Sequence, residues 1–81
     1  MTGAKRLGRP RSVEVQLGAG GLPASYGATH VESVLEDWLV EDRWWSDRPV
    51  RRRYLELVLE TGRCVLVFRD LTNGRWYSQR G

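Results

Sequence analysis

The strongest constraint on this fold is the series of extended segments in the C-terminal third of the chain. Over 51–60, Leu55, Leu57 and Leu59 recur at every second position; over 63–69, apolar residues fall on both faces; and a third extended segment follows at 75–79. Thr61-Gly62 separates the first two segments, and Asn73-Gly74, a strong hairpin sequence, separates the last two. Because a period of two places successive side chains on opposite faces of a strand, the pattern predicts a three-stranded antiparallel meander.

Apolar side chains lie on both faces of this predicted meander. In the second strand Leu66 and Phe68 face one way and Val65 faces the other, so the sheet has to be covered on both sides or curled upon itself. A sequence of 81 residues is long enough for one domain only. We therefore expect an all-β fold over 12–81, a small five-stranded barrel of the SH3-like or OB-like type that ends in the meander. The expected core residues are Val13, Val15, Leu55, Leu57, Leu66 and Phe68.

The N-terminal part divides into a basic segment and two extended segments. Residues 1–11 hold four basic residues and no acid, which predicts a disordered basic arm. Alternation over 12–17 predicts a strand, and the glycines of 18–21 end it. A second, irregular strand is expected over about 24–38, where Gly27 permits a bulge.

Residues 31–40 permit two interpretations. The apolar side chains at helical spacing are Val31, Val34, Leu35, Trp38 and Leu39. Against a helix, the segment is short, lies among β-rich sequences and contains a tryptophan, which is enriched in strands. We favour a strand with a bulge near Val34–Leu35 and keep a helical turn as the alternative.

Residues suited to catalysis or metal binding are few. Cys64 is the sole cysteine and His30 the sole histidine, so the chain has neither an intramolecular disulfide nor the usual ligands of a zinc site. Cys64 falls within an apolar strand, which predicts a buried, inert thiol. We expect His30 to be an exposed or half-buried strand residue. The sequence therefore predicts a protein that is not an enzyme and uses no cofactor and no metal.

Targeting features are equally sparse. The positively charged start of the chain is not followed by the apolar segment of a secretory signal, and no apolar run is long enough to cross a membrane. Together with the single cysteine, these features predict a cytoplasmic protein.

The charge reverses its sign in the middle of the chain. Residues 32–42 hold five acids and no base, whereas residues 43–53 hold five arginines against one acid. One interpretation is cross-strand pairing of the arginines with the acids, which stabilises little where such pairs are exposed. The other is a phosphate-binding track along Arg51, Arg52 and Arg53 that the basic arm extends. Within this triplet, Arg52 faces opposite to its two neighbours.

Two adjacent aromatic pairs, Trp44-Trp45 and Trp76-Tyr77, stand close to arginines. Since neighbours in an extended chain face opposite ways, one member of each pair points outward. We expect Trp45 and Tyr77 to be exposed and Trp44 to point inward. Exposed rings beside arginine form either a base-stacking platform or a protein-binding hot spot. The alternative is that the basic arm or the loop at 18–23 covers them.

Several motifs together resemble a small bacterial protein family of unknown function. They are Asp42-Arg43-Trp44-Trp45, Arg48-Pro49-Val50-Arg51-Arg52-Arg53-Tyr54, Gly62-Arg63 and the segment 68–77. They are also similar to the C-terminal module of ImuB-type proteins, which are Y-family-polymerase-like but lack polymerase catalytic residues. The resemblance covers residues 12–80 and implies a place in the mutasome, where ImuB-type proteins link the sliding clamp to an error-prone polymerase.

The expected function is that of a non-catalytic interaction or adaptor module associated with DNA repair or translesion synthesis, with a partner protein from the DNA-damage-tolerance machinery. The alternative is a small barrel that binds single-stranded or duplex nucleic acid directly. A small enzyme subunit or regulator is a third interpretation, and we expect no membrane partner. The candidate binding residues are Arg43, Trp45, Arg48, Arg51, Arg52, Arg53, Arg75 and Tyr77.

Overall fold

A computed structural model describes residues 10–42, 45, 47 and 49–79 of the chain. This part of the chain is all-β apart from a short 3₁₀ turn, η1, at Ala19–Gly21. Its strands are β1 (Arg11–Ser12), β2 (Val15–Leu17), β3 (Pro23–Tyr26), β4 (Thr29–Asp42), β5 (Val50–Leu59), β6 (Cys64–Asp70) and β7 (Trp76–Gln79). The predicted all-β class is confirmed.

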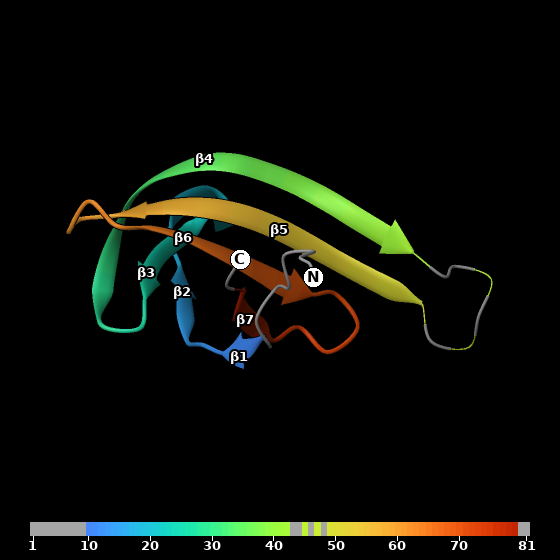
Figure 1. The fold of residues 1–81 in the computed structure, drawn as a ribbon. Helices are drawn as coiled ribbons and strands as arrows, with labels where there is room; N and C mark the ends of the chain where they lie inside the picture. The colour runs from blue at the N-terminus through green and yellow to red at the C-terminus, as the bar shows by residue number, and fades with distance from the viewer. Residues whose placement is uncertain (1–9, 43–44, 46, 48, 80–81) are drawn as a thin grey trace, which may run out of the picture.

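The described strands form one curled antiparallel sheet in the order β1-β7-β6-β5-β4-β3-β2 (Figure 1). The two outermost strands are consecutive in the chain and are joined through Val13 and Glu14. Val13 N donates to Trp76 O (3.1 Å) on the β7 side, and Gly27 N donates to Glu14 O (2.8 Å) on the β3 side. The segment 11–17 therefore bridges both ends of the sheet.

The predicted C-terminal meander is confirmed as β5-β6-β7. Leu55 pairs with Val67 and Tyr54 with Phe68 between β5 and β6, and Phe68 pairs in turn with Tyr77 of β7. The Asn-Gly turn closes with Gly74 N donating to Asp70 O at 2.7 Å, and Gly74 adopts φ 75°, which glycine tolerates best.

The concave face of the curled sheet carries the core, and we call it the inner face. Its buried residues are Leu55, Leu57, Leu59, Val65, Val67 and Trp76. Val13 and Val15 are half-buried against this cluster. Leu66 and Phe68 were expected in the same core but point to the opposite, outer face, where Leu66 is half-buried and Phe68 is buried. Alternation along β6 makes this division unavoidable.

Residues 31–40 form a strand, as favoured, and the helical alternative is wrong. The register of β4 against β5 shifts between Val31 and Ser33 and again between Val34 and Glu36, which places a bulge at the expected position. The irregular strand expected over about 24–38 is two strands, because Gly27 (φ 59°) forms a tight turn between β3 and β4 instead of a bulge.

The strand count differs from the expected five for the same reason. The expected first strand is split into β1 and β2, and the expected second into β3 and β4, so the described sheet has seven strands. It begins at Arg11, one residue before the expected boundary at Ser12, and residues 1–9 of the expected basic arm lie outside the described residues.

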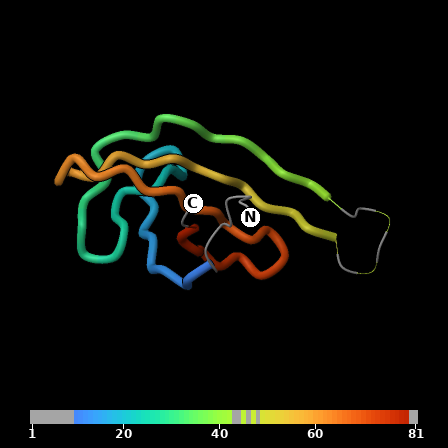
Figure 2. Tube along the Cα trace, in the orientation of Figure 1, coloured from blue at the N-terminus to red at the C-terminus, as the bar shows by residue number. Residues whose placement is uncertain are grey.

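The far ends of β4 and β5 project beyond the other strands (Figures 1 and 2). Along this projection the inner face passes from the core residue Leu55 to Arg53 and Arg51. Since no other strand covers the inner face there in the figures, charged side chains can occupy it at little desolvation cost.

Within the described residues, no helix is long and apolar enough to span a membrane.

Candidate functional site

A row of aromatic rings crosses the outer face of the sheet. The register aligns Trp38 of β4 with Tyr54 of β5, Phe68 of β6 and Tyr77 of β7. Neighbouring ring centroids are 5.4, 5.1 and 5.2 Å apart, with interplanar angles of 10°, 41° and 23°. We call these residues the aromatic row. Because the distance between neighbouring ring centroids is close to the distance between adjacent strands, each ring packs against the next across the sheet.

Arg52 lies over the middle of the aromatic row. Its guanidinium carbon is 4.4 Å from the centroid of the Phe68 ring, and Nη1 donates to the hydroxyl of Tyr54 at 3.2 Å. Phe68, with rings on both sides and this cation above it, is only 2% exposed. The sequence placed Arg52 on the correct face, but the side chain is half-buried rather than fully exposed, because stacking holds it against the sheet.

Arg51 and Arg53 lie on the inner face and are paired with acids of β4. Arg51 Nε donates to Glu41 Oε2 at 3.0 Å. Arg53 donates through Nε and Nη2 to the two carboxylate oxygens of Asp37, at 2.9 and 2.6 Å. The Arg53 hydrogen bonds hold the pKa of Asp37 below its usual value, and the same bonds raise the pKa of Arg53. Of the two interpretations of the charge reversal, the structure shows cross-strand pairing at these positions.

Carboxylates flank the aromatic row on both sides. Glu36 of β4 and Glu56 of β5 are directly opposite each other on the outer face, and we call them the acidic pair. On the other side, Asp70 lies opposite Arg52. The hydroxyl and N–H of Thr72 both donate to Asp70, which keeps the pKa of this carboxyl below its usual value. Among the described residues, the cation that stacks on the row is Arg52, and carboxylates lie on either side of it.

The other predicted binding residues are scattered or fall outside the described part. Trp45 is 69% exposed, as expected. Tyr77 is half-buried in the aromatic row, and its hydroxyl accepts from Asn73 Nδ2 at 3.3 Å. Arg75 is exposed in the turn before β7. Arg43, Arg48 and the expected inward Trp44 lie outside the described residues.

Three members of the aromatic row were not among the candidate binding residues: Trp38 and Tyr54 were missed, and Phe68 was expected only in the core. Trp38 is 40% exposed and ends the row at β4. The register of β4 against β5 has no shift between Glu36 and Asp42, so counting back from the pairing of Asp42 with Val50 places Trp38 opposite Tyr54.

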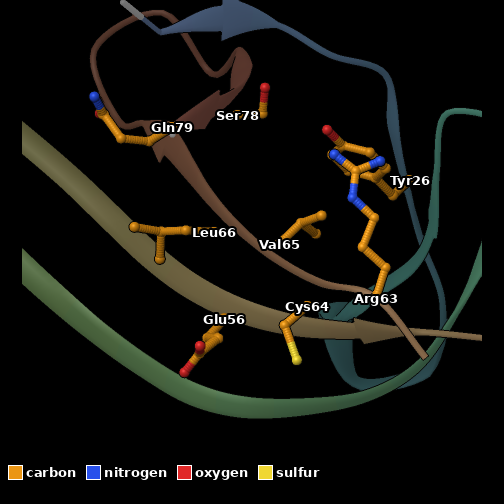
Figure 3. A pocket seen from close by; sticks show the side chains of 8 residues that line it. All are labelled: Tyr26, Glu56, Arg63, Cys64, Val65, Leu66, Ser78 and Gln79. Atoms are coloured by element: carbon orange, nitrogen blue, oxygen red, sulfur yellow. The ribbon is translucent and has the colours of Figure 1, made fainter. Parts of the chain in front are cut away.

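A small pocket of about 350 Å³ lies between β6, the end of β7 and β3 (Figure 3). Its lining side chains include Tyr26, Glu56, Arg63, Cys64, Leu66 and Gln79. The expectation of a buried Cys64 thiol is wrong, because Cys64 is exposed. It faces outward opposite Val58, and the pairing of β7 with β6 reaches only as far as Leu66.

His30 is exposed in β4, as expected. Within the described part of the chain, His, Cys, Asp and Glu side chains nowhere gather in threes in a way that could hold a metal ion.

Comparison with known proteins adds no relative. No family model matches the chain, and neither a curated protein nor a solved structure is significantly similar to it.

Proposed function

We propose that this chain is a non-catalytic protein-interaction module that uses the aromatic row and its surroundings to bind a partner. The observation that carries the proposal is the pairing of Arg51 with Glu41 and of Arg53 with Asp37. These pairs occupy two of the three cations of the arginine triplet that a phosphate track would use. What remains on the outer face is a row of rings with Arg52 and several acids, a composition that suits a protein partner better than a polyanion.

The association with DNA-damage tolerance rests on the resemblance of the sequence motifs to ImuB-type C-terminal modules. Under this proposal the chain acts in the cytoplasm as an adaptor, and the partner belongs to the translesion-synthesis machinery. The fold type proposed with it is a small barrel of the SH3-like or OB-like type. Its support is the curled sheet whose two ends are joined through Val13 and Glu14.

Direct binding of single-stranded nucleic acid is the second candidate. Trp38 at the end of the aromatic row favours it, because bases stack on exposed rings, Trp38 is 40% exposed and the chain has a formal net charge of +3. In this case Trp38 and Arg52 would contact bases and phosphates. The carboxylates of Glu36, Glu56 and Asp70 around the row oppose this candidate.

The two candidates are separated by a salt series of DNA binding. Fluorescence polarisation of labelled single-stranded and duplex oligonucleotides is measured from low to physiological salt, with Arg52→Ala as the test variant and Arg63→Ala as the matched control. A protein-interaction module binds the oligonucleotides only weakly, and neither variant changes that affinity. Affinity that falls steeply with salt and is weakened by Arg52→Ala but not by Arg63→Ala establishes the nucleic-acid candidate.

The biological association is tested in cells that carry the gene. Deletion should lower the frequency of damage-induced mutation, and the wild-type chain should restore it. An unchanged frequency contradicts the link to translesion synthesis.

A further inference from the structure

Among the described strands, none lies beside one side of β4 over most of its length. β3 pairs with β4 only at Thr29 and His30, whereas β5 pairs with β4 as far as Asp42. Among the described residues, nothing in the sheet order lies against the other side of β4 beyond His30. Bulges interrupt the first half of this side, but Glu36–Asp42 pairs with β5 without a register shift. We call Glu36–Asp42 the open edge.

Strand geometry fixes which backbone groups the open edge offers. The carbonyl of Arg51 accepts from Leu71 N at 2.9 Å, so the backbone groups of Arg51 face β6. Alternation then turns the groups of Arg52 toward β4, and those of its register partner Val40 toward β5. The remaining alternate residues direct their N–H and C=O groups away from the sheet. They are Asp37, Leu39 and Glu41.

The aromatic row ends at this edge. Trp38 stacks on Tyr54 with one face of its indole, and the side chain is still 40% exposed. A strand added beside β4 would place a side chain opposite Trp38 at about 4.5–5.5 Å between Cβ atoms. Since that is the spacing between the existing rings, a guanidinium or a ring at this position would extend the row by one member.

The charges along the edge specify the partner's chemistry. On the inner face the acids Asp37 and Glu41 are already paired with arginines, and Leu39 between them is 54% exposed. On the outer face Glu36 faces Glu56, which leaves two carboxylates side by side. An added strand is therefore complementary if it presents arginines to the outer face and apolar side chains to the inner face.

A second copy of this chain fits the open edge poorly. In the antiparallel register that pairs the whole edge with itself, Asp37 faces Glu41 and Glu36 faces Asp42, so every acid meets an acid.

We propose that the open edge binds an extended, arginine-rich segment of the partner protein as an additional antiparallel strand. The segment hydrogen-bonds to Asp37, Leu39 and Glu41 through its backbone, places an arginine against the free face of Trp38 and neutralises the acidic pair. This inference rests on the proposed function, and it names the partner's chemistry at the site.

The probe is a labelled heptapeptide of alternating arginine and valine, with arginine at both ends, whose binding to the intact chain is followed by fluorescence polarisation. Leu39→Pro removes an outward N–H, a position at which a strand edge tolerates proline, and Leu39→Thr keeps that N–H as the matched control. We expect Leu39→Pro to weaken binding at least about tenfold relative to Leu39→Thr. Circular dichroism verifies that both variants are folded.

Three further comparisons keep the test decisive if Leu39→Pro unfolds. N-methylation of the three valines removes the peptide's donors and should abolish binding to the wild-type protein. Trp38→Ala and Glu36→Gln should each weaken binding by about two- to fivefold, whereas Trp38→Phe should retain most of it. A peptide with glutamate in place of arginine should not bind.

Several results overturn the proposal. They are absence of binding by the arginine peptide, equal binding after N-methylation, binding of single-stranded DNA that Trp38→Ala abolishes, and self-association in sedimentation that Leu39→Pro abolishes. If the peptide-binding test fails but deletion of the gene still lowers the frequency of damage-induced mutation, the proposed function is still supported. Conversely, if the peptide binds at the open edge but deletion leaves the mutation frequency unchanged, the link to translesion synthesis is wrong and the binding site is supported.

Discussion

Arg53 holds both carboxylate oxygens of Asp37 across β4 and β5, although the strand register places Asp37 opposite Leu55 and not opposite Arg53. The guanidinium reaches diagonally along the inner face, where the sheet no longer encloses a core. This diagonal pair lies where the apolar core gives way to the projecting hairpin.

The pair predicts a pH-dependent contribution to stability. Because the pKa of Asp37 is lower in the folded chain than in the unfolded chain, the stabilisation is complete above the unfolded pKa and is lost as the pH falls through the folded pKa. Asp37→Asn should lower the free energy of unfolding by about 0.5–1 kcal/mol at pH 7, since both side chains are well exposed. Urea unfolding at a series of pH values should show the variant and the wild type converging below about pH 4. Glu32→Gln is the control, and a pH-independent difference would contradict the assignment.

Phe68→Ala tests whether the outer face has a core of its own. Phe68 is 2% exposed between two rings and beneath Arg52, so its removal should cost about 3–5 kcal/mol. Leu71→Ala, at an exposed position in the following turn, should change stability by less than about 0.5 kcal/mol. Equal denaturant midpoints for the two variants would show that Phe68 is not structural.

Arg52→Lys should not be a neutral change. A planar guanidinium stacks on Phe68 and also donates to Tyr54, whereas an ammonium cannot do both in the same geometry. We expect a loss of about 0.5–1 kcal/mol in the free energy of unfolding, measured at moderate salt. Arg75→Lys, in an exposed turn, is the matched control and should have the stability of the wild type.

Glu36→Gln should stabilise the chain while weakening the binding of the arginine peptide. Like charges directly opposite each other on neighbouring strands are unfavourable, so removing one should raise the free energy of unfolding by about 0.2–1 kcal/mol. The gain should shrink as salt is added, because salt screens the repulsion. A variant less stable than the wild type would mean that Glu36 makes a favourable contact.

Gly74→Ala separates backbone strain from crowding. A methyl group at Gly74 would meet its nearest atom, Arg69 Nη2, at an ordinary 3.8 Å, but φ is 75°. The cost should therefore be about 1–2 kcal/mol and purely conformational. Gly74→Asn, which tolerates this region better, should cost less. Thermal unfolding of the two variants tests the order, and equal losses would point to another cause.

The sequence predicted the elements in which local patterns agree. The meander of β5, β6 and β7 followed from period-two alternation and an Asn-Gly turn, and the bulge in β4 followed from a helical spacing within a strand-like context. The tight turn at Gly27 was mistaken for a bulge, because a positive φ suits both and only the pairing of Tyr26 with Thr29 distinguishes them.

The candidate site was harder to predict because it depends on register. Arg51, Arg52 and Arg53 are adjacent in sequence, yet Arg52 stacks on the outer face while its neighbours pair with acids on the inner face. The aromatic row draws one ring from each of four strands, so no local window contains it. Cys64 was misplaced for a related reason, since its exposure depends on where β7 ends.

The bridging segment 11–17 also has a consequence for the order of events during synthesis. Arg11 and Ser12 of this segment pair with β7, which spans Trp76–Gln79. Because the ribosome releases N-terminal segments first, β1 has no partner until Trp76–Gln79 has been translated. Closure of the sheet is therefore a late step with a large loop to close, and a nascent chain stalled before Trp76 would leave Val13 and the inner core uncovered.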